Sequence, residues 1–420
     1  MRKKIIIKGP ALSQTGYGEQ TRFALRCLRS RPDLFDIYLI NLEWGASNHI
    51  VGESEERIWI VKTIRATLAL LQSGQVESGH FKFDLSLQVT IPNEFEPMAA
   101  VNVGYTAGIE TNKVSRQWIE QANNLMDRLI VISNHSRDIY KNTLYYHKDP
   151  SGVHNLGEIK LQKPCHTVNY SVKPRSNKDI DIEFPHDFNY LCISQWGPRK
   201  NFENTIKWFM EENYNNDVGL ILKTNYRKNC TMDRAHTEGS IKQMLEPYKG
   251  RKCSVTLLHG YMTEEEMQSL YEHKQVKAFV NIAHGEGFGL PLFDAAAAAL
   301  PIITIGWSGH CDFLYKDEEA LFLPVKHALL PVDASAVWPG VIEKEAEWAY
   351  ADQSSFKMAL REMRKNYDTY KEKATTLSRW VKETFTEENQ YNQFVKHCWG
   401  SEPPTKEDSR AWETDIVVYE

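Results

Sequence analysis

The sequence lacks several features that would assign the chain to a specialised class. No run of about 18 apolar residues occurs, so no membrane-spanning helix is predicted. The apolar stretch behind the charged start is too short for a signal peptide. The seven cysteines show no Cys-x-x-Cys or Cys/His ligand spacing, so neither a disulfide framework nor a zinc site is predicted. We therefore expect a cytoplasmic protein without a metal site.

The chain also lacks a strong charge of one sign. Its 50 Lys and Arg residues and 55 Asp and Glu residues give a formal net charge of −5. This balance argues against polyanion binding over the whole surface, although a local basic face is compatible with it. The composition is that of a globular protein, with 42% hydrophobic and 25% charged residues. At 420 residues the chain is too long for one ordinary core, and two or three domains are expected.

Short apolar runs alternate with amphipathic stretches in both halves of the chain, which predicts βαβ units and a mostly parallel sheet in each. The predicted strands are 5–7, 37–42, 101–105, 128–132, 190–194, 218–223, 255–258, 278–282 and 302–305. The predicted helices are 17–28, 57–71, 114–124, 135–145, 201–212, 264–273, 292–299, 354–373 and 387–398. The fold class is therefore α/β, with a polar linker over 171–184. We expect a domain over 1–175, a second over 176–385, and a C-terminal helix and tail over 386–420 that cross back to the first.

The most informative segment is 281–296, where a predicted strand runs into a glycine-rich turn and then a helix. Pro291 stands where the first helical turn is expected. A turn of this kind at the carboxyl end of a parallel strand offers free N–H groups and a helix N-terminus to phosphate oxygens. The residues of the turn expected to line the bound ligand are Gly285, Gly287, Phe288, Gly289 and Leu290.

Two carboxylates, Glu286 and Asp294, stand eight residues apart across this turn. Carboxylates accept paired hydrogen bonds from vicinal hydroxyls, as on a ribose or a hexose. The alternative is a purely structural βα turn with a capping carboxylate.

The spacing of these two acids resembles the Glu-x7-Glu motif of retaining glycosyltransferases of the GT-B fold, the superfamily that includes glycogen synthase and sucrose synthase. That resemblance implies two facing Rossmann-like domains with a cleft between them, and a nucleotide-sugar co-substrate, for which we expect a UDP-sugar. It implies that Glu286 contacts the transferred sugar and that Asp294 holds the donor ribose. Asp294 departs from the motif, because its shorter side chain replaces a Glu.

Two further segments support the resemblance. Arg199 and Lys200 stand in Ser194-Gln-Trp-Gly-Pro-Arg-Lys-Asn, which is similar to the family segment whose cations grip the donor diphosphate. Fixed cations would stabilise the leaving group without a metal; the alternative is a solvated basic turn. Gly16 and Gly18 follow the first strand and resemble the family's N-terminal glycine loop, which faces the donor phosphates; the alternative is a plain tight turn.

Three positions keep two interpretations each. Glu110, after the strand at 101–105, is a candidate catalytic residue that contacts the donor sugar or the acceptor, or else a helix-capping or salt-bridged residue. The segment 133–137, with His135, lines the acceptor side or caps a helix. The segment 307–310, with His310, touches the nucleotide or forms a structural loop.

The resemblance thus implies a glycosyltransferase, a hexosyl- or pentosyltransferase, that moves a sugar from a nucleotide to a hydroxyl with retention. The rivals are a non-catalytic nucleotide-sugar-binding protein of the same fold and a phosphorylase-like enzyme, although no pyridoxal phosphate site is evident. Residues 16–22 and 42–45 resemble glycosyltransferases of tailed viruses, some of which modify hydroxymethylated DNA bases. DNA is therefore one candidate acceptor, and its phosphates would need a basic surface. The candidate cations are Lys113, Arg116, Arg137, Lys141, Arg227 and Lys228.

Overall fold

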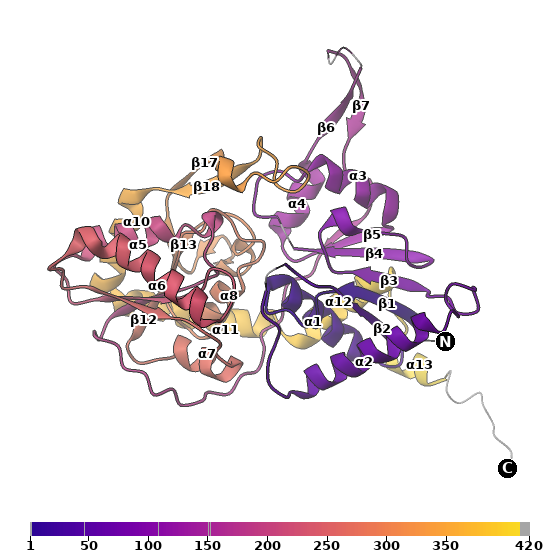
Figure 1. The fold of residues 1–420 in the computed structure, drawn as a ribbon, viewed down its shortest axis with the longest axis horizontal. Helices are drawn as coiled ribbons and strands as arrows, with labels where there is room; N and C mark the ends of the chain where they lie inside the picture. Colours follow the sequence, from indigo (N-terminus) through magenta and orange to yellow (C-terminus); the bar gives the residue numbers. More distant parts are fainter. Residues whose placement is uncertain (1, 46, 108, 150, 152, 412–420) are drawn as a thin grey trace. The chain divides into compact units, whose positions relative to one another are not determined.

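The computed structural model describes residues 2–45, 47–107, 109–149, 151 and 153–411. It divides the chain into two compact units. The first comprises Met1–Gly108, Val114–Ser171 and Glu387–Glu420, and the second comprises Ile109–Lys113 and Val172–Thr386. Each unit has one six-stranded sheet (Figure 1). The last nine residues of the expected C-terminal tail, 412–420, lie outside the described residues.

The first unit is built on a parallel sheet with the strand order β2-β1-β3-β4-β5-β8. Its strands are β1 (Lys3–Gly9), β2 (Phe35–Asn41), β3 (Leu85–Gln88), β4 (Val101–Thr106), β5 (Arg128–Val131) and β8 (Cys165–Thr167). The helices between them are α1 (Gly16–Arg29), α2 (Glu55–Gln72), α3 (Arg116–Leu125) and α4 (Asn134–Asn142). Ile5, Ile6 and Ile7 are completely buried, as expected for a strand covered on both faces.

The helix α12 (Glu387–Trp399) belongs to the first unit although residues 172–386 precede it in the chain. It packs on α1. Phe394 is completely buried, with its ring 5.9 Å from that of Phe23 and 5.1 Å from that of Tyr105. A short helix, α13 (Lys406–Ala411), follows it.

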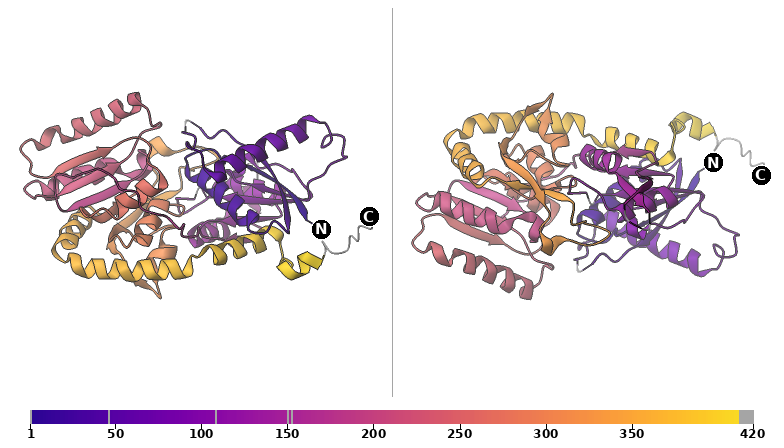
Figure 2. Two further views of the ribbon diagram at one scale, coloured as in Figure 1. Left: turned by 90° about the horizontal axis from the view of Figure 1, so that it is seen from below. Right: turned by 90° about the horizontal axis from the view of Figure 1, so that it is seen from above.

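The second unit repeats the architecture with the parallel strand order β11-β10-β9-β12-β13-β16. Its strands are β9 (Asn189–Ile193), β10 (Gly219–Lys223), β11 (Ser254–Leu258), β12 (Val276–Asn281), β13 (Ile302–Ile305) and β16 (Leu323–Val325). Its helices are α5 (Phe202–Asn213), α6 (Thr231–Leu245), α7 (Glu264–Tyr271), α8 (Leu290–Ala297), α9 (Cys311–Leu314), α10 (Gln353–Lys365) and α11 (Tyr367–Thr384). Helices cover both faces of this sheet (Figure 2), so the predicted class, two Rossmann-like α/β units, is confirmed.

Two helix predictions were wrong in their extent. The predicted helix over 354–373 is two helices, α10 and α11, which meet at Asn366, where the backbone leaves the helical region (φ −118°, ψ 39°). The predicted helix over 135–145 ends at Asn142, because Thr143 turns to extended geometry and Tyr145 begins a strand. Periodicity alone detects neither the break at Asn366 nor the end at Asn142, since apolar residues continue at helical spacing through both positions.

The sequence prediction also missed two β-hairpins. One joins β6 (Tyr145–Lys148) to β7 (Asn155–Ile159) and projects from the sheet of the first unit (Figure 1). The other joins β17 (His327–Pro331) to β18 (Glu347–Ala351) in the second unit, between β16 and α10. Within the described part of the chain, no helix is long and apolar enough to cross a bilayer.

Candidate functional site

The candidate site lies at the carboxyl ends of the central strands of the second sheet, at the point where the strand order reverses. The chain runs from β9 outward through β10 to β11 and then returns to β12 on the other side of β9. The loops after β9 and β12 therefore leave neighbouring strands at their carboxyl ends, the position at which open α/β sheets bind ligands. Arg199 and Lys200 stand in the first loop and Glu286 in the second.

Backbone and side-chain hydrogen bonds fasten these two loops to each other. The N–H of His284 donates to the carbonyl of Arg199 (2.8 Å), and the side-chain amide of Asn201 donates to the carbonyl of Ile282 (3.1 Å). Asn201 adopts left-handed backbone geometry (φ 55°), which Asn tolerates better than most residues. It starts α5 directly after the two cations. The two loops are thus held together as one site by direct hydrogen bonds.

Glu286 is the buried centre of the site, with 6% of its surface exposed. One carboxylate oxygen lies 2.5 Å from the Lys200 ammonium and accepts from the Asn281 amide at 3.2 Å, and the other lies 3.3 Å from the Arg199 guanidinium. Burial alone would raise the pKa of Glu286, but the charges of Lys200 and Arg199 outweigh it and lower the pKa to about 2. Glu286 is therefore a carboxylate throughout the physiological pH range.

The two cations differ in their surroundings. Arg199 donates to the Gly285 carbonyl at 2.6 Å and also pairs with Glu110 at 3.2 Å. Burial would lower the pKa of Arg199, but Glu110 and Glu286 raise it. Burial and the neighbouring Arg199 lower the pKa of Lys200, in spite of its contact with Glu286. The sequence predicted Glu110, Arg199, Lys200 and Glu286 as catalytic residues, and they form one connected cluster.

Glu110 lies in the segment Ile109–Lys113, which belongs to the second unit although the chain on either side of it belongs to the first. Gly285 makes the approach feasible, since a Cβ at that position would lie 2.1 Å from the Glu110 carbonyl oxygen. Asn112 anchors the same segment to Glu347 on β18 through three hydrogen bonds. Glu110 thus forms a salt bridge with Arg199, and its contact with a donor sugar or an acceptor stays a prediction.

The start of α8 explains the other glycines of the turn. Gly289 has φ +88°, which L side chains rarely adopt, and it caps the helix that begins at Leu290. Phe288 is buried, and its ring packs against those of Phe293 and Phe313 with centroid distances of 5.1 and 5.0 Å. Gly287 lies in the same buried stretch.

Asp294 is half-buried on α8 and pairs with Arg175 at 3.0 Å. This ion pair raises the pKa of Arg175 against the opposing effect of burial. Sequence reasoning missed Arg175, which stands in the polar linker over 171–184 with no motif around it.

The segment 307–310 contacts the backbone of Glu286 through Ser308. Ser308 accepts the Glu286 N–H at 2.9 Å, and its own hydroxyl lies 3.4 Å from Nδ1 of His310. The other ring nitrogen of His310 lies 2.6 Å from the Ile305 carbonyl, which must accept, so Nδ1 is left to accept from Ser308. Burial lowers the pKa of His310, in keeping with a neutral ring. These contacts are those of a structural loop that positions Glu286.

His284 connects the site to the β17–β18 hairpin. Its ring nitrogen Nδ1 donates to the Ala349 carbonyl, and the Ala349 N–H donates to the His284 carbonyl, both at 2.9 Å. The His284 ring stacks on that of Trp348, with a centroid distance of 5.5 Å and an interplanar angle of 13°. The sequence prediction contained neither this hairpin nor its role beside the loop.

In the first unit, the glycines and the segment 133–137 also have defined places. Gly16 is the exposed first residue of α1, and Gly18 packs so closely that a Cβ would lie 2.0 Å from the Ser13 carbonyl oxygen. Ser133 caps α4 by accepting from the Ser136 N–H, so the segment with His135 does cap a helix.

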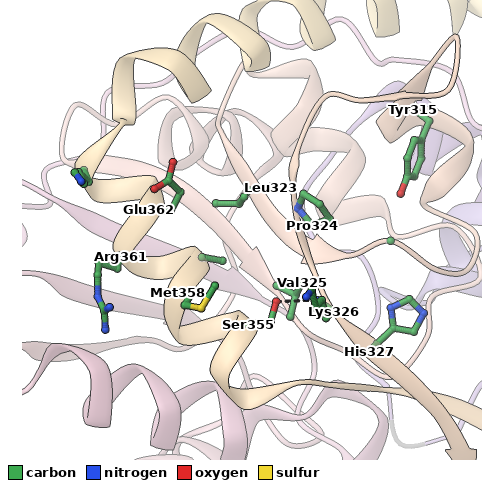
Figure 3. A pocket seen from close by; sticks show the side chains of 13 residues that line it. Tyr315, Leu323, Pro324, Val325, Lys326, His327, Ser355, Met358, Arg361 and Glu362 are labelled. Atoms are coloured by element: carbon green, nitrogen blue, oxygen red, sulfur yellow. Dashed lines mark hydrogen bonds between the residues drawn. The ribbon is translucent and has the colours of Figure 1, made fainter.

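A separate pocket of about 710 Å³ lies between β16 and α10 (Figure 3). Its wall includes Pro324 and Val325 on β16 and Met358 and Arg361 on α10. It also includes Gly306, which follows β13, but none of the predicted site residues.

No protein-family model matches the chain, and no curated protein matches it in sequence. Solved structures do match. Sucrose-phosphate synthase from Thermosynechococcus elongatus has a TM-score of 0.60 at 13% identity, covering 94% of this chain and 98% of that one. Anabaena Alr3699/HepE in complex with UDP and glucose has a TM-score of 0.56 at 11% identity, covering 94% and 99%. The GT-B fold is confirmed.

A mutant of Staphylococcus aureus TarM matches with a TM-score of 0.48 at 15% identity over 76% of this chain. This chain covers 55% of that protein, so it spans about half of that protein's length.

Proposed function

We propose that the protein is a nucleotide-sugar-dependent glycosyltransferase whose donor site is formed by the loops after β9 and β12. The observation that carries the proposal is the cluster of two cations around one buried carboxylate, Glu286, at the reversal point of the second sheet. A nucleotide sugar needs both charges there, because its diphosphate is anionic and its hydroxyls are hydrogen-bond donors. The likeness of the fold to the HepE structure with UDP and glucose supports this choice of ligand.

In the proposed reaction, the bond between the anomeric carbon and the diphosphate oxygen breaks, and the diphosphate leaves with the bonding electrons. The acceptor oxygen then bonds to the anomeric carbon on the same face and passes its proton to the departing diphosphate oxygen. Arg199 and Lys200 stabilise the charge that develops on the leaving diphosphate. Glu286 has a pKa of about 2, so it acts as a fixed anion and hydrogen-bond acceptor for the sugar rather than as a proton donor.

The remaining roles follow the sequence prediction. Asp294 would hold the donor ribose, with Arg175 fixing its carboxylate. The turn at 285–290 would offer backbone N–H groups, and Gly16 and Gly18 would contact the donor phosphates. Transfer with retention, the choice of UDP, and the distinction between a hexose and a pentose are parts of this proposal.

The acceptor is the least constrained part. A hydroxymethylated DNA base stays a prediction, and two of the cations offered for DNA phosphates are already paired. Arg116 contacts Glu120 at 2.9 Å, and Arg137 contacts Asp138 at 2.8 Å. Pairing reduces the charge available for counterion release, so we propose a hydroxyl acceptor in general and treat DNA as one arm of the test.

The test is transfer from UDP-, ADP- and GDP-linked sugars to water, simple glycosides, lipids and hydroxymethylcytosine DNA, followed by mass spectrometry of the products. Turnover with at least one donor, lost in Arg199→Ala, supports the proposal. Transfer activity should persist in EDTA, because Arg199 and Lys200 would stabilise the negative charge of the leaving diphosphate. Tight donor binding without turnover on any acceptor, water included, would instead favour the non-catalytic rival.

A further inference from the structure

The cluster around Arg199 is already electrically balanced by the protein itself. Two cations, Arg199 and Lys200, face two carboxylates, Glu286 and Glu110, with every charged contact between 2.5 and 3.3 Å. The formal charge of these four side chains is therefore zero. A nucleoside diphosphate that adds to a neutral cluster gains less than one that adds to a cationic one, because each buried charge is already paired.

The two carboxylates are held with different strength. Glu286 has 8% of its side chain exposed, contacts both cations and Asn281, and stands in a loop that Ser308 fastens. Glu110 has 21% of its side chain exposed and pairs with Arg199 at 3.2 Å, without the second cation and the amide that also hold Glu286. If one carboxylate yields to an incoming phosphate, Glu110 is therefore the one.

We propose that Glu110 is an anionic stand-in for the donor diphosphate: its carboxylate pairs with Arg199 until a phosphate replaces it. The inference rests on the proposed function, because it assigns Arg199 to the diphosphate. Exchange of one anion for another leaves Arg199 paired throughout, so the guanidinium keeps its position between the two states.

The stand-in is kept in place by an anchor on the β17–β18 hairpin. Asn112 donates its backbone N–H to the Glu347 carbonyl (3.2 Å) and its side-chain amide to the Glu347 carboxylate (2.7 Å), and it accepts the Glu347 N–H (2.8 Å). This anchor, together with the contact of the Glu110 carbonyl with Gly285, fixes the backbone while the Glu110 side chain can turn away. Asn112 is thus a positioning residue that acts on Arg199 through Glu110.

The experiment measures calorimetric affinity for UDP and for uridine in the full chain and its variants. Glu110→Gln keeps the size of the side chain but removes the charge, and UDP should bind about tenfold more tightly, a change of about 1.4 kcal/mol. Uridine, which has no phosphate, should bind unchanged. Glu345→Gln, an exposed acid on the same hairpin, is the matched control and should leave both affinities unchanged.

The anchor is tested by a double-mutant cycle. Asn112→Ala should tighten UDP binding less than Glu110→Gln does, and it should have no further effect in the Glu110→Gln background. Glu347→Ala, which removes only the 2.7 Å bond, is a second probe if Asn112→Ala does not fold. An additive effect in the double variant would show that the anchor does not act through Glu110 and would overturn that part.

Failure of the inference differs from failure of the proposed function. If Arg199→Ala weakens UDP binding while Glu110→Gln leaves it unchanged or weaker, the stand-in is wrong and the donor site stands. If Glu345→Gln tightens UDP as much as Glu110→Gln, the effect is a general one of charge and the stand-in is again wrong. If UDP, ADP and GDP all fail to bind, or if Arg199→Ala does not weaken binding, the proposed function itself is refuted.

Discussion

Replacement of Glu286 by glutamine is the most direct test of the donor site. The substitution keeps the size and one hydrogen-bond acceptor but removes the negative charge that faces Lys200 at 2.5 Å and Arg199 at 3.3 Å. A hydrogen bond to a charged group contributes about 1.5–3 kcal/mol, so the loss predicts a fall of about 10- to 150-fold in kcat/KM. Glu286→Ala should abolish measurable transfer, because it removes the contact entirely and leaves Lys200 without its closest partner.

The pH dependence gives this prediction a second, independent measure. The pKa of Glu286 is lowered to about 2, so its charge is constant in the range in which enzymes are normally assayed. The ratio of kcat/KM between wild type and Glu286→Gln should therefore stay level from pH 5 to pH 8, whatever the shape of each profile. The assay is steady-state transfer or donor hydrolysis, with circular dichroism to confirm folding of the variant.

Two results would refute the reasoning about Glu286. Full activity of Glu286→Gln would show that the charge plays no part in the reaction. A ratio that changes about tenfold between pH 5 and pH 7 would show that Glu286 titrates in the working range, against its observed pairing with two cations.

Three further predictions concern the same unit. Arg199→Ala and Lys200→Ala should weaken UDP binding about 10- to 150-fold and leave uridine binding nearly unchanged, because charged contacts to phosphate are lost; equal losses for both ligands in calorimetry would contradict this. Asp294→Ala should raise KM for the donor with little change in kcat, and Arg175→Ala should do so more weakly; a pure kcat effect in steady-state kinetics would argue against ribose binding. Burial would raise the pKa of Asp233, but hydrogen bonds from His259 and three backbone N–H groups outweigh it and lower this pKa. The ionised Asp233 therefore stabilises the folded state above the pKa that the group has in the unfolded chain, and this contribution is lost as the pH falls below about 4. In urea unfolding, Asp233→Asn should therefore be less stable than wild type at pH 7, and the difference should shrink in acid; a constant difference would disprove the pairing.

The two loops of the candidate site could be predicted because their signals are local. A strand end, closely spaced glycines and a proline identify a βα turn within a few residues, and Gly289 does take the positive φ that such a turn needs. Arg199, Lys200 and Glu286 each lie directly beyond a predicted strand end. Since parallel strands present their carboxyl ends at one edge of a sheet, their meeting follows from the strand pattern alone.

The partners that hold these residues could not be predicted in the same way. Asn112 and Glu347 are 235 residues apart, and neither carries a motif. Arg175 is one basic residue in a polar linker, and nothing nearby relates it to Asp294. Such pairs arise from the way in which chain segments return to the sheet, and that information is not contained in local periodicity.

The missed elements have a similar cause. β3 has only four residues, Leu85–Gln88, and it was missed although Leu85, Leu87 and Val89 alternate with polar residues. Ser86 and Gln88 are buried as well, so the strand lacks the continuous apolar run expected of a strand covered on both faces. The β17–β18 hairpin surrounds a small core of Val332, Ala346 and Trp348, too few residues to give a clear alternating pattern.

The position of α12 has a consequence for the order in which the protein matures during translation. Residues 387–399 are synthesised only after all of 172–386, yet Phe394 fills the space between Phe23 and Tyr105 in the first unit. The usual sequence, in which the N-terminal part finishes folding first, is therefore reversed here. While the second unit is being synthesised, the face of α1 that packs on α12 in the finished protein still lacks that helix. The unit that begins the chain is therefore completed last, and a chain that ends before residue 387 would contain the whole sequence of the second unit but lack the helix that completes the first.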